Sequence, residues 1–173
     1  MEKHIEVMIS KEELDARICE LADSINKDYE GKELHLIVIL KGSVFFACEL
    51  AKKITVPVTM DFMAVSSYGD GMVSAGKITV KKELDEDITG KDVLIVEDIV
   101  DSGNTLFYLK KLLLARNPES LKIITLLDKP ERRTVEILTD YCGFEIPDKF
   151  VVGYGLDYAQ KYRNLPYIGV VQD

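Results

Sequence analysis

The sequence predicts an α/β fold with a mostly parallel central sheet flanked by helices. Two apolar runs, at residues 34–40 and within 92–97, are continuous rather than alternating, as expected for strands buried on both faces. Between the predicted strands lie segments whose apolar residues recur at helical spacing. Strands that alternate with helices in this way are typical of a parallel sheet joined by crossover helices.

The first half of the chain is predicted to contain two helices and three strands. Ser10 and Glu13 form a capping-box pattern at the start of a helix over about 10–27. Apolar residues follow there at helical spacing: Leu14, Ile18, Leu21 and Ile25. We expect a strand at 34–40, a helix at 44–53, and strands at 56–65 and 78–82. Between the last two, residues 66–77 are rich in Ser, Gly and Asp, which predicts a mobile loop.

The second half continues the alternation. We expect a strand at 92–97, a helix at about 105–116, and strands at 121–127 and 150–154. No repeat, low-complexity tract or interdomain linker interrupts the sequence, so residues 1–173 are expected to form a single domain. Its core is expected at about 34–145. The N-terminal segment and residues from about 146 to 173 are expected to form a small lobe.

The composition argues against several classes of protein. Of 173 residues, 47% are hydrophobic and 30% are charged, which fits one globular domain. A net charge of −8 argues against broad binding to nucleic acid, which needs clustered Lys and Arg. No apolar run approaches the ~18 residues of a membrane-spanning helix, and the first residues lack the apolar core of a signal peptide. The three cysteines have neither metal-ligand nor disulfide spacing. We therefore expect a cytoplasmic protein that binds neither membrane nor nucleic acid.

The residues around the end of the strand at 92–97 have the chemistry of a binding site. Two adjacent acids, Glu97 and Asp98, are followed by Asp101 and by the small polar residues 102–105, which open a helix. Such a turn offers backbone N–H groups and hydroxyls to a phosphate, whereas the acids suit ribose hydroxyls or Mg²⁺. Taken singly, Asp101 and Ser102 could equally be a helix cap. Neither the P-loop pattern nor the dinucleotide glycine fingerprint is present.

The stretch VLIVEDIVDSGNTL at residues 93–106 resembles the phosphoribosyl-diphosphate motif of the type I phosphoribosyltransferases. The resemblance is strongest to the hypoxanthine-guanine enzymes of the bacterial branch. It extends from Leu40 through Val170 in the order that the family shows. It implies the type I phosphoribosyltransferase fold, with a small hood lobe over the core.

The resemblance assigns roles to the central segment. Glu97 and Asp98 are expected to hold the ribose hydroxyls and, through water, Mg²⁺. Asp101 is expected to be the catalytic residue, beside the purine N7, where a carboxylate can take the proton that the imidazole ring loses. It is also counted among the residues that bind phosphoribosyl diphosphate. The 5′-phosphate is expected on the turn that follows: Ser102, Gly103, Asn104 and Thr105. Some relatives have Lys or Arg in place of Asn104, so one cationic contact is absent here.

Three further segments are assigned to phosphoribosyl diphosphate. Leu40, Lys41 and Gly42 match the family's diphosphate loop, in which the Leu–Lys peptide bond is often cis. Ser67 and Tyr68 match a pair on a lid that closes over the reacting centre, which would exclude water from an oxocarbenium-like transition state. Arg163 is expected to reach the leaving diphosphate. Without the family, these residues read as an ordinary turn, a long loop and a surface arginine.

The purine is assigned to the C-terminal third. Lys129 is expected to donate to the purine O6, which distinguishes 6-oxopurines from adenine. Phe150 is expected to stack on the base, and the backbone of Val151 to bond its edge. Asp157 is expected to bind Mg²⁺ and to read the 2-position through its carbonyl. Taken alone, Lys129 reads as a solvated loop residue and Phe150 as core.

These assignments together imply a purine salvage enzyme. It would transfer the phosphoribosyl group from 5-phosphoribosyl 1-diphosphate to N9 of hypoxanthine, and of guanine, giving IMP or GMP and diphosphate. Mg²⁺ is the expected cofactor, and a homodimer or homotetramer is the expected assembly. Two alternatives stay open: an enzyme for xanthine, and a regulatory protein of this fold that binds nucleic acid. The acidic net charge disfavours the second. His4 and His35 are interpreted as structural.

Overall fold

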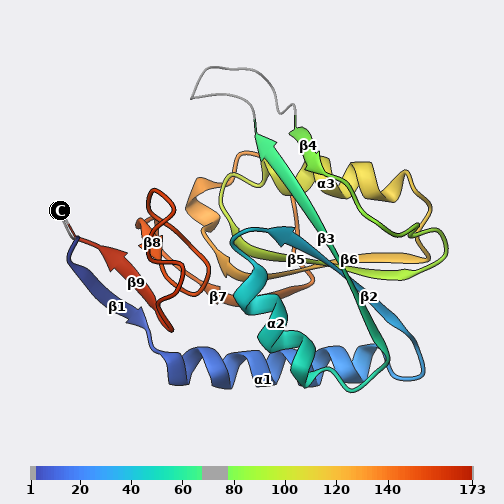
Figure 1. The fold of residues 1–173 in the computed structure, drawn as a ribbon, viewed down its shortest axis with the longest axis horizontal. Coiled ribbons are helices and arrows are strands. Elements are labelled where there is room, and N and C mark those ends of the chain that lie inside the picture. The colour runs from blue at the N-terminus through green and yellow to red at the C-terminus, as the bar shows by residue number, and fades with distance from the viewer. Residues whose placement is uncertain (1–2, 68–77, 173) are drawn as a thin grey trace.

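The computed structural model describes residues 3–67 and 78–172, which contain a six-stranded sheet, a three-stranded sheet and three α-helices (Figure 1). The six-stranded sheet has the order β4-β3-β2-β5-β6-β7. All neighbouring pairs in it are parallel except β3 with β4. The predicted α/β class with a mostly parallel sheet is therefore confirmed. Its strands are β2 (Leu34–Leu40), β3 (Val58–Ser67), β4 (Ile78–Lys82), β5 (Asp92–Val100), β6 (Ser120–Asp128) and β7 (Tyr141–Glu145).

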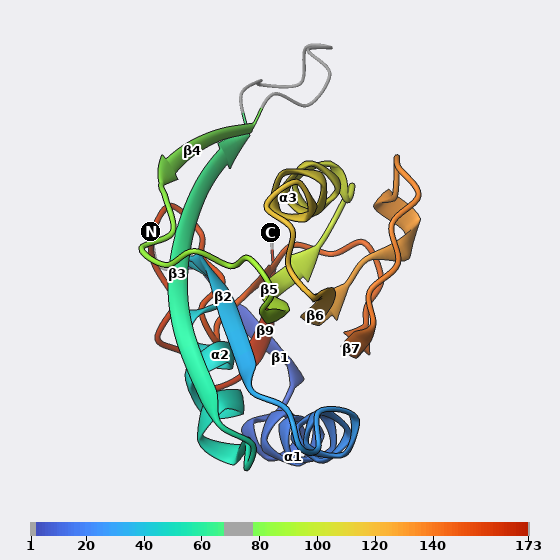
Figure 2. The same cartoon turned by 90° about the vertical axis from the view of Figure 1, so that its right-hand side faces the viewer.

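Helices cover both faces of this sheet (Figure 2). α1 (Lys11–Asp28) and α2 (Val44–Lys53) lie on one face, and α3 (Asn104–Leu114) lies on the other. Because successive side chains of a strand point to opposite faces, β2 contributes to both cores. Leu36 and Val38 join the core under α1 and α2, whereas Ile37 and Ile39 join the core under α3. This double burial explains why β2 is a continuous apolar run.

The predicted start of α1 is confirmed in detail. The Glu13 backbone N–H donates to Ser10 Oγ at 3.1 Å, and the Ser10 N–H donates to Glu13 Oε2 at 3.0 Å. α2 has the predicted bounds, and β2 and β4 also match their expected ranges. Local capping and periodicity therefore predict these elements well, since the same residues make the contacts that the pattern requires.

β3 begins and ends two residues later than expected, and two further strands differ in ways that bear on the site. β5 continues past Glu97 because its pairing with β6 extends to Val100, which lies opposite Asp128. Glu97 and Asp98 therefore lie inside the strand rather than at its end. The strand expected at 150–154 is reduced to β8 (Val151–Val152), because Gly153 and Tyr154 both have positive φ and turn the chain.

A second, antiparallel sheet joins the two ends of the chain. Its order is β1-β9-β8, with β1 (Ile5–Ile9) and β9 (Ile168–Val171) paired along their length. β1, β7 and β9 were not predicted, and neither was the short 3-10 helix η1 (Pro130–Arg132). Of the N-terminal segment, β1 joins this small sheet, whereas α1 packs against α2 and β7. In the described ranges, no helix is long and apolar enough to cross a membrane.

Candidate functional site

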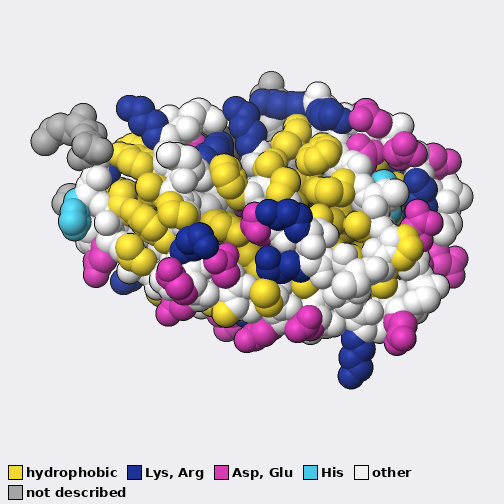
Figure 3. Space-filling model, turned by 60° about the horizontal axis from the view of Figure 1, so that its bottom comes forward, with side chains coloured by type: hydrophobic (Ala, Val, Ile, Leu, Met, Phe, Trp, Pro, Cys, Tyr) yellow, Lys and Arg dark blue, Asp and Glu magenta, His cyan; other side chains and the backbone are white. Residues whose placement is uncertain are grey.

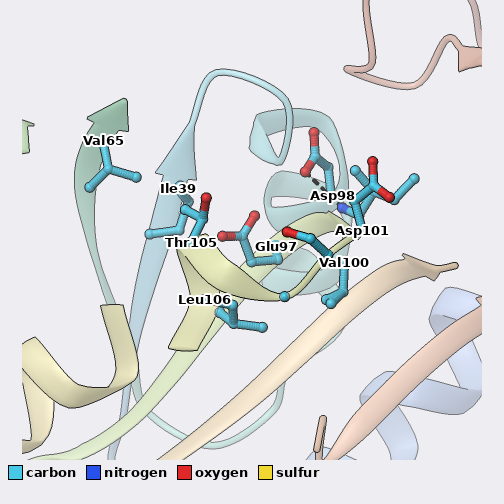
Figure 4. A pocket seen from close by; sticks show the side chains of 11 residues that line it. Ile39, Val65, Glu97, Asp98, Val100, Asp101, Thr105 and Leu106 are labelled. Carbon is cyan, nitrogen blue, oxygen red and sulfur yellow. Dashed lines mark hydrogen bonds between the residues drawn. The ribbon is translucent and has the colours of Figure 1, made fainter. Parts of the chain in front are cut away.

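Most of the site residues predicted in the central segment lie at the carboxyl edge of β5, between that strand and the start of α3 (Figure 4). A pocket of about 230 Å³ opens there. Its lining combines acids, small polar residues and apolar side chains: Ile39, Val65, Glu97, Asp98, Ile99, Val100, Asp101, Ser102, Gly103, Thr105 and Leu106. Ligands of open α/β sheets bind beyond the carboxyl ends of the strands, and this pocket has that position.

Glu97 and Asp98 form an acidic pair, in which Glu97 is buried and Asp98 is half-buried. Burial, followed by the charge of Asp98, raises the pKa of Glu97 well above its usual value. Burial likewise raises the pKa of Asp98 to about 6, and the nearby charge of Asp157 adds to it. The Ile99 backbone N–H donates to Asp98 Oδ1 at 2.7 Å. Carboxylates in this state gain from hydroxyl donors or from a cation, because either one offsets the lost hydration and the mutual repulsion.

The turn at 102–105 leaves the start of α3 available to an anion. Gly103 is the N-cap residue with φ +87° and has no side chain to cap the helix; the Asn104 N–H donates to Ser102 Oγ at 3.3 Å, and no described side chain accepts from the two amides that follow. The first turn of α3 contains no acidic residue, so the positive end of the helix is not neutralised locally. A β carbon on Gly103 would lie 2.8 Å from Ile137 Cγ2, which shows how closely the segment after η1 packs on this turn. Free amides at a helix start are suited to a phosphate.

The predicted diphosphate loop lies directly beside the acidic pair. The Leu40–Lys41 peptide bond is cis. A β carbon on Gly42 would lie 1.8 Å from Asp98 Oδ2, so the turn after β2 touches β5. The Lys41 ammonium donates to Gln160 Oε1 at 3.2 Å. The structure thus brings the predicted loop, the acid pair and the C-terminal segment together.

Arg163 and Asp157 lie on the same side. One terminal nitrogen of Arg163, Nη2, lies 3.3 Å from Asp157 Oδ1 and donates to Gln160 Oε1 at 3.1 Å. The other, Nη1, donates to the Gly155 carbonyl at 2.6 Å. The Gln160 backbone N–H donates to Asp157 Oδ2 at 2.8 Å. Two cations, from Lys41 and Arg163, therefore converge on Gln160 next to the predicted diphosphate loop.

The predicted base-reading residues lie beyond Asp101. Lys129 is 7% exposed, and its backbone N–H donates to the Val100 carbonyl at 2.9 Å. It is therefore buried, contrary to the solvated-loop reading. Phe150 is 54% exposed and stands edge-on to Tyr158, with 5.6 Å between ring centroids, so the core reading of this ring was wrong. Val151 is buried in β8. An exposed aromatic ring and a buried ammonium are the two kinds of group that suit a flat base with a polar edge.

A model of the phosphoribosyl transferase domain matches residues 10–159. The chain belongs to the phosphoribosyltransferase family. It is 53% identical to a hypoxanthine phosphoribosyltransferase of Salmonella typhimurium, and 52% identical to one of Escherichia coli, each over 99% of this chain and 97% of the relative. A solved hypoxanthine-guanine phosphoribosyltransferase of Bacillus anthracis superposes with a TM-score of 0.94 at 49% identity, over 99% of this chain and 100% of that one. The predicted type I phosphoribosyltransferase fold is confirmed.

Within the family, the roles assigned to individual residues remain predictions. Ser67 ends β3, and Tyr68 lies outside the described residues. No group of three or more His, Cys, Asp or Glu side chains in the described ranges is arranged to hold a metal ion. Glu97, Asp98 and Asp157 therefore do not form a protein cage, although the charges of Asp98 and Asp157 influence each other. A Mg²⁺ ion bound by one or two carboxylates together with substrate oxygens needs no such cage.

Three polar residues of this phosphoribosyltransferase site were missed. Gln160 accepts from both Lys41 and Arg163. Arg132 lies with Nε 2.9 Å from Asp101 Oδ1 and with Nη1 3.5 Å from Asp148 Oδ2. The Lys129 ammonium in turn lies 4.0 Å from Asp148 Oδ1. No motif marks these three positions, and their contacts join segments that are distant in sequence, so nothing in the local pattern could have found them.

Proposed function

We propose that this chain transfers the phosphoribosyl group from 5-phosphoribosyl 1-diphosphate to N9 of hypoxanthine, and of guanine, in purine salvage. The products are IMP or GMP and diphosphate. The observation that carries the proposal is that four kinds of group lie around the end of β5. The acid pair, the Asp101 carboxylate and the start of α3 line one pocket, and the buried Lys129 is hydrogen-bonded through its backbone to Val100 at the end of the same strand. These groups suit ribose hydroxyls, an N7 proton, a 5′-phosphate and an O6 atom, respectively.

The chemistry follows from these positions. N9 of the base forms a bond to C1 of the ribose, and the bond from C1 to the diphosphate oxygen breaks, with its electron pair leaving on the diphosphate. The proton on N7 passes to the carboxylate of Asp101. Lys41 and Arg163 stabilise the negative charge that develops on the leaving group. The backbone of Val151, the ring of Phe150 and the carbonyl of Asp157 would orient the base. Ser67 and Tyr68 would exclude water from the reacting centre.

Mg²⁺ is proposed as the cofactor because the site residues fit it. Glu97 and Asp98 are crowded carboxylates with raised pKa values, and the charge of Asp157 raises the pKa of Asp98 further. A cation near these three residues would relieve their repulsion. When bound with the substrate, the ion would shield the diphosphate and make it a better leaving group. Chelation with EDTA should abolish turnover, and added Mg²⁺ should restore it.

We also propose self-association as a homodimer or homotetramer, and a cytoplasmic location. Figure 3 shows apolar side chains gathered on the face that includes α1 and α2. Phe45 of α2 is 44% exposed, and Met60 and Phe62 of β3 are only partly buried. A second copy of the chain would cover such a face, and sedimentation velocity would reveal it. Cys19 and Cys48 are free and exposed, which fits a reducing compartment.

A panel of bases tests the proposed activity. Hypoxanthine, guanine, xanthine and adenine are each incubated with 5-phosphoribosyl 1-diphosphate and Mg²⁺, and mononucleotide formation is measured. We expect turnover of hypoxanthine and guanine and little turnover of adenine. Turnover of adenine alone would contradict the role of Lys129. A protein that turns over none of the four bases would contradict the proposed activity altogether.

A further inference from the structure

Four side chains with alternating charge form a row along the base side of the site. Asp101 follows β5, Arg132 ends η1, Asp148 lies in the connection from β7 to β8, and Lys129 precedes η1. Nitrogen–oxygen distances between neighbours are 2.9 Å for Arg132–Asp101, 3.5 Å for Arg132–Asp148 and 4.0 Å for Lys129–Asp148. The row therefore links the carboxylate assigned to N7 with the ammonium assigned to O6.

The two ends of this row carry opposite charges that serve one edge of the purine. An ammonium and a carboxylate that face a common space attract each other, and a direct pair between them would fill that space. In the described part of the chain, each is instead paired with a different partner: Lys129 with Asp148, and Asp101 with Arg132. The middle two residues thus act as separate counter-ions for the outer two.

These pairs leave hydrogen-bonding capacity unused at both ends. The Lys129 ammonium, at 4.0 Å from Asp148, is too far away to donate a hydrogen bond to it. Asp101 Oδ1 is buried against Arg132 Nε at 2.9 Å, but the side chain of Asp101 as a whole is 47% exposed, so the rest of its carboxylate stays accessible. Lys129 therefore keeps its donors for an O6 acceptor, and Asp101 keeps an accessible carboxylate oxygen for an N7 proton.

The geometry points to Arg132 and Asp148 as positioning residues that set the preference for 6-oxopurines. They hold the Lys129 ammonium and the Asp101 carboxylate apart, in place and free to bond the base. This inference rests on the proposed function and names the residues behind its base specificity. Arg132 and Asp148 are themselves half-exposed, with side-chain exposures of 53% and 43%. Ion pairs this exposed add little to stability, so removing them should alter the site more than the fold.

The test compares Arg132→Gln and Asp148→Asn, singly and together, with the unchanged chain. Measured quantities are kcat, KM for hypoxanthine, KM for 5-phosphoribosyl 1-diphosphate, and the ratio of kcat/KM for hypoxanthine to that for adenine. We expect each variant to raise KM for hypoxanthine by about 10-fold and to lower the ratio similarly, since a polar contact to O6 is weakened. KM for 5-phosphoribosyl 1-diphosphate should stay within about two-fold, because neither Arg132 nor Asp148, the two residues changed, is assigned to it.

Two further comparisons separate positioning from general damage. Since the row acts as a unit, the double variant should resemble the single ones rather than multiply their effects. Asp148→Glu and Arg132→Lys, which keep the charges, should recover part of the lost hypoxanthine affinity. The matched control is the ion pair Arg116–Glu83, which lies away from the site. Its N–O distance is 2.7 Å. Arg116→Gln and Glu83→Gln should leave both KM values unchanged.

The possible results distinguish the positioning role of Arg132 and Asp148 from the proposed function. If the unchanged chain forms IMP but the variants keep its KM for hypoxanthine, or raise both KM values equally, the positioning role is wrong and the proposed function stands. If the unchanged chain forms no mononucleotide from any 6-oxopurine, the proposed function fails and this inference fails with it. A selective rise in KM for hypoxanthine, partly recovered by the charge-conserving variants, supports the positioning role.

Discussion

Gly42 and Asp98 are in such close contact that a β carbon on residue 42 would lie 1.8 Å from the Asp98 carboxylate. The contact follows from the parallel register of β2 and β5, in which Val38 lies opposite Val96. The turn that follows β2 and the acids near the end of β5 are thereby brought to one place. The segments assigned to the diphosphate and to the ribose hydroxyls share this contact.

Gly42→Ala should therefore impair the site rather than the fold. The added methyl group has to displace the Asp98 carboxylate, and we expect KM for 5-phosphoribosyl 1-diphosphate to rise by about 10-fold or more. Steady-state kinetics and thermal unfolding would be measured together. Gly31→Ala is the control. A β carbon at this position meets nothing within 4 Å, but the alanine has to adopt a φ of +76°. It should lower the unfolding free energy by about 1 kcal/mol and leave KM unchanged. The reverse pattern would contradict the contact.

Asp101→Asn should lower turnover much more than substrate binding. An amide cannot take the N7 proton, so we expect kcat to fall by about 100-fold. KM for 5-phosphoribosyl 1-diphosphate should change by less than about three-fold, since Asp101 is assigned mainly to the base. Asp23→Asn, an exposed change on α1, is the control. Equal losses in kcat and in diphosphate binding would count against the role of Asp101 as a base.

Lys129→Gln should weaken the preference for 6-oxopurines. Loss of the ammonium leaves the O6 acceptor with a poorer donor, and kcat/KM for hypoxanthine should fall by about 100-fold. Activity with adenine should not fall in parallel, so the ratio of the two kcat/KM values is the informative measurement. Lys111→Gln, on the exposed side of α3, removes the same charge away from the site. A variant that keeps the hypoxanthine preference would show that Lys129 does not read O6.

Stability should depend on pH through His35. Burial, followed by the charge of Lys91, lowers the pKa of this imidazole below its usual value, and Nδ1 lies 2.7 Å from Thr59 Oγ1. The unfolded chain therefore binds a proton on His35 below a pH of about 6.5, where the folded chain resists it. The contribution of the neutral His35 to the free energy of unfolding is therefore full above this pH and is lost as the pH falls below it.

The measurement is urea unfolding between pH 5 and pH 8 for the unchanged chain and for His35→Gln. Glu97 and Asp98, with raised pKa values, act in the opposite direction, so the difference between the two proteins isolates His35. That difference should change below pH 6.5 by at most about 1.4 kcal/mol per pH unit, the limit for one proton. Identical pH profiles would show that His35 is not responsible.

Elements whose determinants are local could be predicted from sequence. α1 follows from a capping box and apolar spacing, and β2 from a continuous apolar run. β1 and β9 were not predicted because each is short and half-exposed. Their pairing also joins Ile5 to Val171, which are far apart in the sequence. Such a pairing leaves no trace in either segment alone.

The candidate site divides in the same way. The phosphate and ribose side lies within one contiguous stretch around β5, so its motif is visible in the sequence. The base side is assembled from separate segments, and Arg132 and Asp148 become meaningful only once η1 and the connection after β7 are neighbours. Resemblance to a family predicted roles for Lys129 and Phe150, whereas the ion pairs between segments could be recognised only in the three-dimensional structure.

The pairing of β8 with β9 also has a consequence for the order of synthesis. β8, which carries Val151, is hydrogen-bonded to β9, and β5 and α3 both precede these two strands along the chain. A growing chain therefore completes β5 and the start of α3, the segments assigned to the sugar phosphate, before β9 is available to hold β8, whose Val151 is assigned to the base.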